Sequence, residues 1–180
     1  MTEYSDKEIL RTFNTNPSKG FDLLVKNYQE RLYWHIQKIL IDHDDTNDVL
    51  QNVFIKVWKS LARFRAESGL YTWLYRIATN ESLTFLKQKK TKLFIPIEDA
   101  EQQIGNMPDD RSPHSGDEIH LILQRAILTL PDKQRLVFNM RYFDEMKYED
   151  MSNILKTSIG ALKASYHHAV KKIENILKED

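Results

Sequence analysis

The chain of 180 residues contains no cysteine and only five glycines and five prolines. Without cysteine, neither a disulfide framework nor a thiolate metal site can form, and a reducing compartment suits the protein. Glycine and proline are scarce, and no run of alternating apolar and polar residues is long enough for a set of strands. The sequence therefore predicts an all-α fold.

Signals for membrane targeting are also missing. No run of about 18 apolar residues could span a bilayer, and no basic and then apolar leader opens the chain. The composition, with 41% hydrophobic and 29% charged residues, is that of a globular protein. We expect a cytoplasmic protein without membrane insertion.

A net charge is absent too, because 26 basic residues balance 26 acidic ones. DNA-binding proteins usually carry a basic surplus, but here the charge is unevenly distributed. Between residues 93 and 118 seven acidic residues accompany the single basic residue Arg111, and the same stretch holds three prolines and two glycines. We predict that residues 93–118 form a flexible acidic linker between two small helical domains, both of them basic.

The first domain is predicted at residues 21–92, after a lead-in of residues 1–20. Apolar residues at steps of three and four predict a helix over 21–40, with Ser18 as a possible N-cap. A second helix follows the acidic start at Asp42, because negative side chains suit the positive end of a helix dipole. The apolar stripes of the two helices are Leu24, Tyr28, Leu32, Ile36 and Ile39 or Leu40, and Val49, Leu50, Val53, Phe54, Val57 and Leu61.

The opposite face of the second helix carries an isoleucine among polar residues. At about 100° per residue this face gathers Asp48, Gln51, Asn52, Ile55 and Lys59, with Trp58 at its rim. An exposed isoleucine indicates a partner surface. Single exposed apolar residues are nevertheless common, so an ordinary solvated face is the alternative.

Aromatic and basic residues interleave from residue 62 to residue 80. Such a mixture binds single-stranded nucleic acid, because bases stack on the rings, each for about 1 to 3 kcal/mol, while cations follow the phosphates. Helical spacing predicts that Thr72, Arg76, Thr79, Asn80 and Lys87 point outward with Trp73 beside them, and that Leu70, Leu74, Ile77, Ala78 and Phe85 point inward. The alternative is that the rings belong to the core and the charges are merely solvated.

The second domain is predicted at residues 119–180. Helical stripes precede and follow the break at Leu130 and Pro131, and a short helix over 148–155 is separated from a longer one by a turn at 156–158. A short helix, a tight turn and a longer helix form the helix-turn-helix plan, which we place at about 148–172. The predicted packing stripe of the last helix is Leu162, Tyr166, Ala169, Ile173 and Leu177.

The other side of the last helix suits a DNA groove. Small residues near its start allow close approach to the bases, and lysines toward its end can meet phosphates. This surface consists of Ala161, Lys163, Ala164, Ser165, His167, His168, Lys171 and Lys172. A plain amphipathic bundle helix would show a similar pattern, so that alternative stays open.

Residues 48–58, with the sequence DVLQNVFIKVW, and residues 71–80, with YTWLYRIATN, resemble domain two of the sigma-70 family of RNA polymerase sigma factors. The resemblance spans about residues 21–90. It implies that core RNA polymerase is bound by Asp48, Gln51, Asn52, Ile55, Trp58 and Lys59. It also implies that the melted strand of the minus-ten element lies at Phe64, Arg65, Tyr71, Trp73, Arg76, Asn80 and Lys87.

Residues 130–135, LPDKQR, and 160–169, GALKASYHHA, resemble domain four of the same family, which recognises the minus-thirty-five element. The short connection between the domains is typical of the extracytoplasmic-function group. Because sigma factors of this group are commonly held inactive by an anti-sigma factor, the resemblance implies such a partner here. The family often has arginine where this chain has Ser165 and His168. Since neutral side chains release no counterions, we expect this domain to depend on its tether to polymerase.

Other functions have weaker support in the sequence. His167 and His168 are neighbours in a predicted helix and diverge by about 100°, so they make a poor metal chelate. No nucleophile elbow or phosphate-binding glycine loop is present, and we expect no catalytic residue and no cofactor. A stand-alone helix-turn-helix regulator and a helical adaptor without a DNA role remain as alternatives to a sigma factor.

Overall fold

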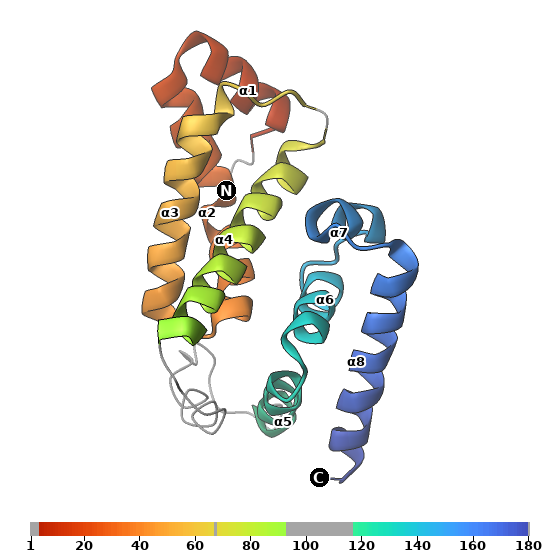
Figure 1. The fold of residues 1–180 in the computed structure, drawn as a ribbon. Helices are drawn as coiled ribbons and strands as arrows, with labels where there is room; N and C mark the ends of the chain where they lie inside the picture. The colour runs from red at the N-terminus through yellow and green to blue at the C-terminus, as the bar shows by residue number, and fades with distance from the viewer. Residues whose placement is uncertain (1–3, 67, 93–116, 180) are drawn as a thin grey trace. The chain divides into compact units, whose positions relative to one another are not determined.

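The structure is a computed structural model that describes residues 4–66, 68–92 and 117–179, with only the backbone described at 90–92, 117–121 and 179. These residues form eight α-helices and no strand (Figure 1). The all-α prediction is therefore confirmed over the described part of the chain. Contacts divide the chain into two units, residues 1–89 and 90–180. Most of the predicted linker, residues 93–116, lies outside the described residues, and its last two residues already belong to a helix.

The first unit contains α1 (Asp6–Thr15), α2 (Pro17–Leu40), α3 (His43–Leu61) and α4 (Leu70–Lys92). α1 lies within the lead-in of residues 1–20, where no helix was predicted. Its N-terminus is a capping box, in which the Ser5 hydroxyl accepts a hydrogen bond from the Glu8 amide and the Glu8 carboxylate accepts one from the Ser5 amide. The hydrogen bond from the Ser5 backbone lowers the pKa of Glu8. Ile9 and Phe13 bury the inner face of this helix.

α1 packs against α2 at Gly20. A Cβ atom at this position would lie 2.3 Å from both the Cα and the backbone nitrogen of Phe13. A real side chain cannot occupy such a position, so the two helix backbones approach closely only because residue 20 has no side chain. Figure 1 shows α1 across the end of the unit where α2 begins and α3 ends.

Replacing Gly20 with alanine is expected to destabilise the first unit by about 1 to 3 kcal/mol, because overpacked backbone must shift. Gly69→Ala is the matched control, since no atom lies within 4 Å of its added Cβ. Thermal unfolding of the full chain followed by circular dichroism measures the difference. Equal melting temperatures for the two variants would contradict the close contact at Gly20.

The predicted stripes of α2 and α3 form the core of the first unit. Every predicted apolar position of the two helices is buried except Phe54, which is half-buried. The predicted cap Ser18 is wrong, because α2 begins at Pro17 and the side chain of Asn16 accepts the capping hydrogen bond from the Lys19 amide at 3.1 Å. The acidic start of α3 is confirmed, with Asp42 as its N-cap.

α4 buries the predicted Leu70, Leu74 and Ala78, but its inward face is wider than its apolar spacing predicted. Thr72 and Thr79 were expected to point outward but are 5% and 0% exposed. The reason is a polar partner in α2, since the buried His35 lies 2.9 Å from the Thr79 hydroxyl through its Nε2. The Tyr75 ring packs on the same histidine at 4.7 Å between centroids. Apolar periodicity cannot reveal such a buried polar contact.

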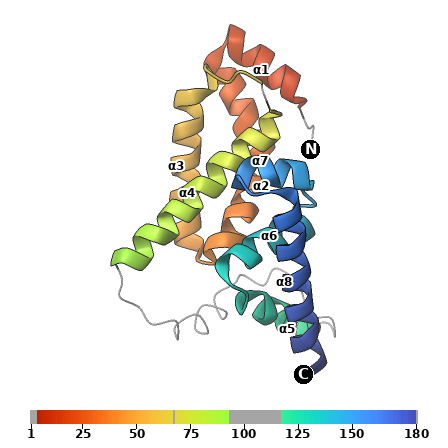
Figure 2. The same cartoon turned by 45° about the vertical axis from the view of Figure 1, so that its right-hand side comes forward.

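The second unit contains α5 (Asp117–Leu128), α6 (Asp132–Tyr142), α7 (Tyr148–Leu155) and α8 (Ile159–Glu179). α8 contacts each of the other three helices (Figures 1 and 2), and α7 with α8 forms the predicted helix-turn-helix. The turn contains Lys156 in a left-handed conformation. Leu177 was expected in the core but is 39% exposed, because Ile176 occupies that position instead. One cluster of the core comprises Ala126, Ile127, Leu130, Phe138, Ala169 and Ile173, and Met140, Met151 and Leu162 are also fully buried.

No helix within the described ranges is both long enough and apolar enough to cross a membrane.

Candidate nucleic-acid interface

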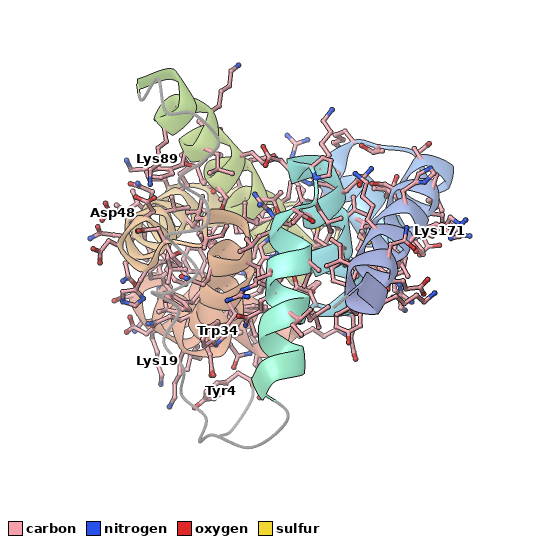
Figure 3. All side chains as sticks on the ribbon, turned by 90° about the horizontal axis from the view of Figure 1, so that it is seen from below. Tyr4, Lys19, Trp34, Asp48, Lys89 and Lys171 are labelled. Carbon is pink, nitrogen blue, oxygen red and sulfur yellow. The ribbon has the colours of Figure 1, made fainter. Side chains whose placement is uncertain are left out.

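The outward face of α3 carries exposed polar side chains around one isoleucine. Asp48, Gln51 and Asn52 are exposed, and the structure describes no hydrogen bond or ion pair from their side chains to any residue that it covers. Ile55 is 45% exposed beside them. Figure 3 shows Asp48 directed away from the neighbouring helices. This combination of unengaged polar groups around one isoleucine suits a protein partner.

Trp58 joins this face to α1 and α2. It is 45% exposed, but its ring meets the ring of Phe21 at 5.0 Å and that of Phe13 at 6.2 Å, both edge to face. Such aromatic contacts restrain the indole. The α1 helix, which sequence analysis missed, therefore supports one end of the α3 face.

A pocket of about 400 Å³ lies between α3 and α4. The pocket is shallow and open to solvent. The structure brings Lys59 of α3 together here with Trp73 and Asn80 of α4, although the sequence placed Lys59 on the partner surface. The complete lining is Lys56, Lys59, Ser60, Trp73, Ile77, Asn80 and Glu81.

Lys56 and Glu81 form an ion pair across this pocket, from α3 to α4. Sequence analysis identified neither residue. A second pair joins the same helices where Lys89 donates to Asp45 at 2.5 Å. Because both pairs are partly exposed, we attribute little stability to them, and the buried inner faces of α3 and α4 set the packing of the two helices.

The loop before α4 adds an aromatic wall. The ring of Phe64 packs on that of Trp73 at 5.0 Å, and Arg65 beside it is exposed. The backbone of this loop is bent sharply, with Ala66 at φ 55°. Of the predicted minus-ten residues, the pocket lining includes Trp73 and Asn80 but not Phe64, Arg65, Tyr71, Arg76 or Lys87. Tyr71 packs on Tyr75 at 4.3 Å, while Arg76 is half-buried and Lys87 is exposed farther along α4.

The second unit presents the predicted surface on α8. Seven of the eight predicted residues are exposed, and Ser165 is half-buried. Figure 3 shows Lys171 directed away from the helices of its unit. The rings of His167 and His168 lie 6.1 Å apart at an angle of 57°. Among the residues that the structure covers, no group of three or more histidine or acidic side chains could hold a metal ion.

The two units thus define a DNA-binding class of protein, with an aromatic and basic pocket in one and a helix-turn-helix in the other. Residues 24–91 match the family description Sigma-70 region 2, and residues 120–173 match Sigma-70, region 4. The chain is 30% identical to the RNA polymerase sigma-H factor of Pseudomonas aeruginosa, over 99% of this chain and 96% of that protein.

Further relatives agree. The chain is 29% identical to the ECF RNA polymerase sigma-E factor of Haemophilus influenzae, over 96% of this chain and 95% of that protein. A solved complex of the sigma factor RpoE with the anti-sigma factor NepR from Bartonella quintana is similar with a TM-score of 0.69 at 22% identity, covering 90% of this chain and 99% of RpoE. The structure of CnrH with the cytosolic domain of CnrY gives a TM-score of 0.69 at 19% identity, with coverages of 97% and 98%. The chain belongs to the sigma-70 family of RNA polymerase sigma factors, in the extracytoplasmic-function group.

Proposed function

We propose that this sigma factor binds core RNA polymerase through the outward face of α3 and captures an unpaired promoter base in the pocket between α3 and α4. The observation that carries the proposal is the pocket itself, where Trp73 and Asn80 meet Lys59. A base can stack on the indole or on the adjoining Phe64 ring, the Asn80 amide can donate to or accept from the base edge, and Lys59 can meet a phosphate.

Opening the promoter in this way requires no bond to be made or broken by the sigma factor. Taking one base out of the stack costs a few kcal/mol, and a preformed pocket with phosphate contacts offsets that cost. The inner faces of α3 and α4 are buried in the core of the unit, which holds the pocket lining in place before DNA arrives, so little reorganisation accompanies binding. RNA synthesis stays with the polymerase, and we assign this chain no enzymatic activity.

The α8 surface is proposed to contact the minus-thirty-five element. Its lysines supply phosphate contacts, and Ala161 and Ala164 leave room for the helix to approach the bases. Ser165 and His168 are uncharged or neutral near pH 7, so they add little to the electrostatic part of the affinity. Tethering through the first unit compensates by raising the effective concentration of the second unit at the DNA.

Residues 117–180 alone are accordingly expected to bind duplex promoter DNA with a Kd weaker than about 1 µM at physiological salt. This fragment has its own core and four helices, so it is a fair test of the isolated surface. Fluorescence anisotropy with a labelled duplex measures the affinity. Submicromolar, sequence-specific binding would show that tethering is not needed.

The chain's partners follow from the same proposal. They are core RNA polymerase, promoter DNA and, by analogy with the two solved complexes, an anti-sigma factor. Because promoter DNA and polymerase are cytoplasmic in bacteria, we place the protein there.

A stand-alone helix-turn-helix regulator is the competing function, and it predicts DNA protection without polymerase. Footprinting on a duplex promoter with the chain alone, core enzyme alone and both together separates the two functions. We expect protection only when both are present. Protection by the chain alone, unchanged by core enzyme, would favour the regulator.

A further inference from the structure

The ring of Tyr148 lies where three helices of the second unit meet. Tyr148 is the first residue of α7, and its ring centroid lies 5.3 Å from the guanidinium carbon of Arg141 at the end of α6. The ammonium nitrogen of Lys163, from the first half of α8, lies 5.7 Å from the same centroid. Both distances are within the roughly 6 Å over which a cation is attracted to an aromatic face.

One side of this cluster is anchored to the backbone. A guanidinium nitrogen of Arg141 donates to the carbonyl oxygen of Met146 at 3.1 Å, and Met146 is buried. Arg141 is therefore held from two directions, by a carbonyl and by the Tyr148 ring. The ring in turn is half-buried, so its position depends on the packing of α6 and α7 rather than on solvent.

Lys163 has no such anchor apart from the ring. It is exposed, and the contact that the structure describes for its ammonium group is with the Tyr148 ring. A lysine on a helix surface normally samples many rotamers and loses that freedom when it binds a phosphate. A lysine whose ammonium is already attracted to an aromatic face loses less rotamer freedom when it binds a phosphate.

We propose that Tyr148 is a positioning residue, whose ring holds the ammonium of Lys163 ready for a backbone phosphate of the upstream promoter element. This inference rests on the proposed function of the α8 surface. The pre-ordering matters here because Ser165 and His168 leave that surface with few fixed positive charges. Arg141 keeps the ring in place through its link to the α6–α7 connection.

A double-mutant cycle in the holoenzyme tests the coupling between ring and ammonium. The variants are Tyr148→Leu, Lys163→Gln and the two combined, and the probe is a duplex promoter recovered from a random library with wild-type holoenzyme. We expect Tyr148→Leu to weaken binding about two- to five-fold in the wild-type background and hardly at all once Lys163 is glutamine. If the fold loss in affinity of the double variant equalled the product of the losses of the two single variants, the inference would be overturned, because the ring would then affect DNA binding independently of Lys163.

Tyr148→Phe separates the ring from the hydroxyl. The phenylalanine keeps the aromatic face, so we expect wild-type affinity and an unchanged dependence of affinity on salt. A loss as large as that of Tyr148→Leu would assign the effect to a hydroxyl contact and contradict the positioning role. Core binding, which the α3 face governs, should be the same for every variant.

A second measurement needs neither DNA nor a folded leucine variant. In NMR spectra of the full chain, side-chain methylene protons of Lys163 near the ring should be shifted upfield in both wild type and Tyr148→Phe. Unshifted protons in the wild type would remove the inference. If the upfield shift is present but wild-type holoenzyme selects no promoter, the proposed function fails and the contact between ring and ammonium stands. If promoters are selected normally but the affinity losses of Tyr148→Leu and Lys163→Gln multiply in the double variant, only the positioning role is rejected.

Discussion

Asn80→Ala in reconstituted holoenzyme should reduce promoter opening about ten-fold or more while leaving core binding unchanged. A well-placed amide contact to a base is worth about 1 to 3 kcal/mol, and Asn80 lines the pocket that we assign to the unpaired base. The side chain is exposed, so its truncation does not disturb the core of the unit. Permanganate reactivity of unpaired thymines measures opening, and a competition assay measures core affinity.

Gln88→Ala is the matched control for this experiment. Gln88 is also a polar, exposed residue of α4 but does not line the pocket. We expect it to open promoters as the wild type does, whereas Phe64→Ala, which removes the aromatic wall beside Trp73, should resemble Asn80→Ala. Normal opening by Asn80→Ala, or an equal loss of opening and of core affinity, would argue against base capture in this pocket.

Asp48→Lys should weaken association with core RNA polymerase about 100-fold. Reversing a charge at a complementary interface places like charges together, which costs several kcal/mol. Asp48 is exposed and makes no described hydrogen bond or ion pair, so the fold should be preserved. The dissociation constant for core enzyme, measured with a fluorescently labelled sigma factor, gives the result.

Glu30→Lys provides the same change of charge at an exposed position of α2, outside the α3 face. It should bind core enzyme within about two-fold of the wild type, since general charge effects of isolated exposed residues are small and screened by salt. If Asp48→Lys kept normal affinity, the α3 face would not be the docking surface. Equal losses in both variants would point to a long-range charge effect instead of a contact.

The helices with simple apolar stripes could be predicted from the sequence. The spacing of Leu24, Tyr28 and Leu32 identified α2, and the acidic residues around Asp42 identified the start of α3. α1 could have been found as well, because Ser5 and Glu8 have capping-box spacing and precede Ile9 and Phe13. The contact of α1 with Trp58 could not be predicted, since it depends on the close approach of α1 and α2 at Gly20.

Two features limited the prediction of which residues are buried: polar contacts between distant helices, and the exact edge of the packed face of a helix. Thr79 is buried because His35, 44 residues earlier in the chain, supplies a partner. In α8, Ile176 and Leu177 both fit an apolar stripe, and only the packing of the neighbouring helices selects the first. The sequence therefore predicted the element in each case but misassigned single residues on it.

The candidate pocket illustrates the same limit at the functional site. Trp73 and Asn80 were predicted as DNA-binding residues from their interleaving with cations and from family resemblance. That Lys59 joins them, and that Lys56 and Glu81 form an ion pair at the same pocket, depends on how α3 and α4 cross. Spacing along one helix contains no information about that crossing.

Run-off transcription on a library of duplex templates, with core RNA polymerase and this chain purified separately, tests the central claim most directly. We expect discrete transcripts that require both proteins and that start at a shared promoter sequence. Transcripts that core enzyme makes equally well alone, together with no measurable binding of the chain to core, would contradict the account.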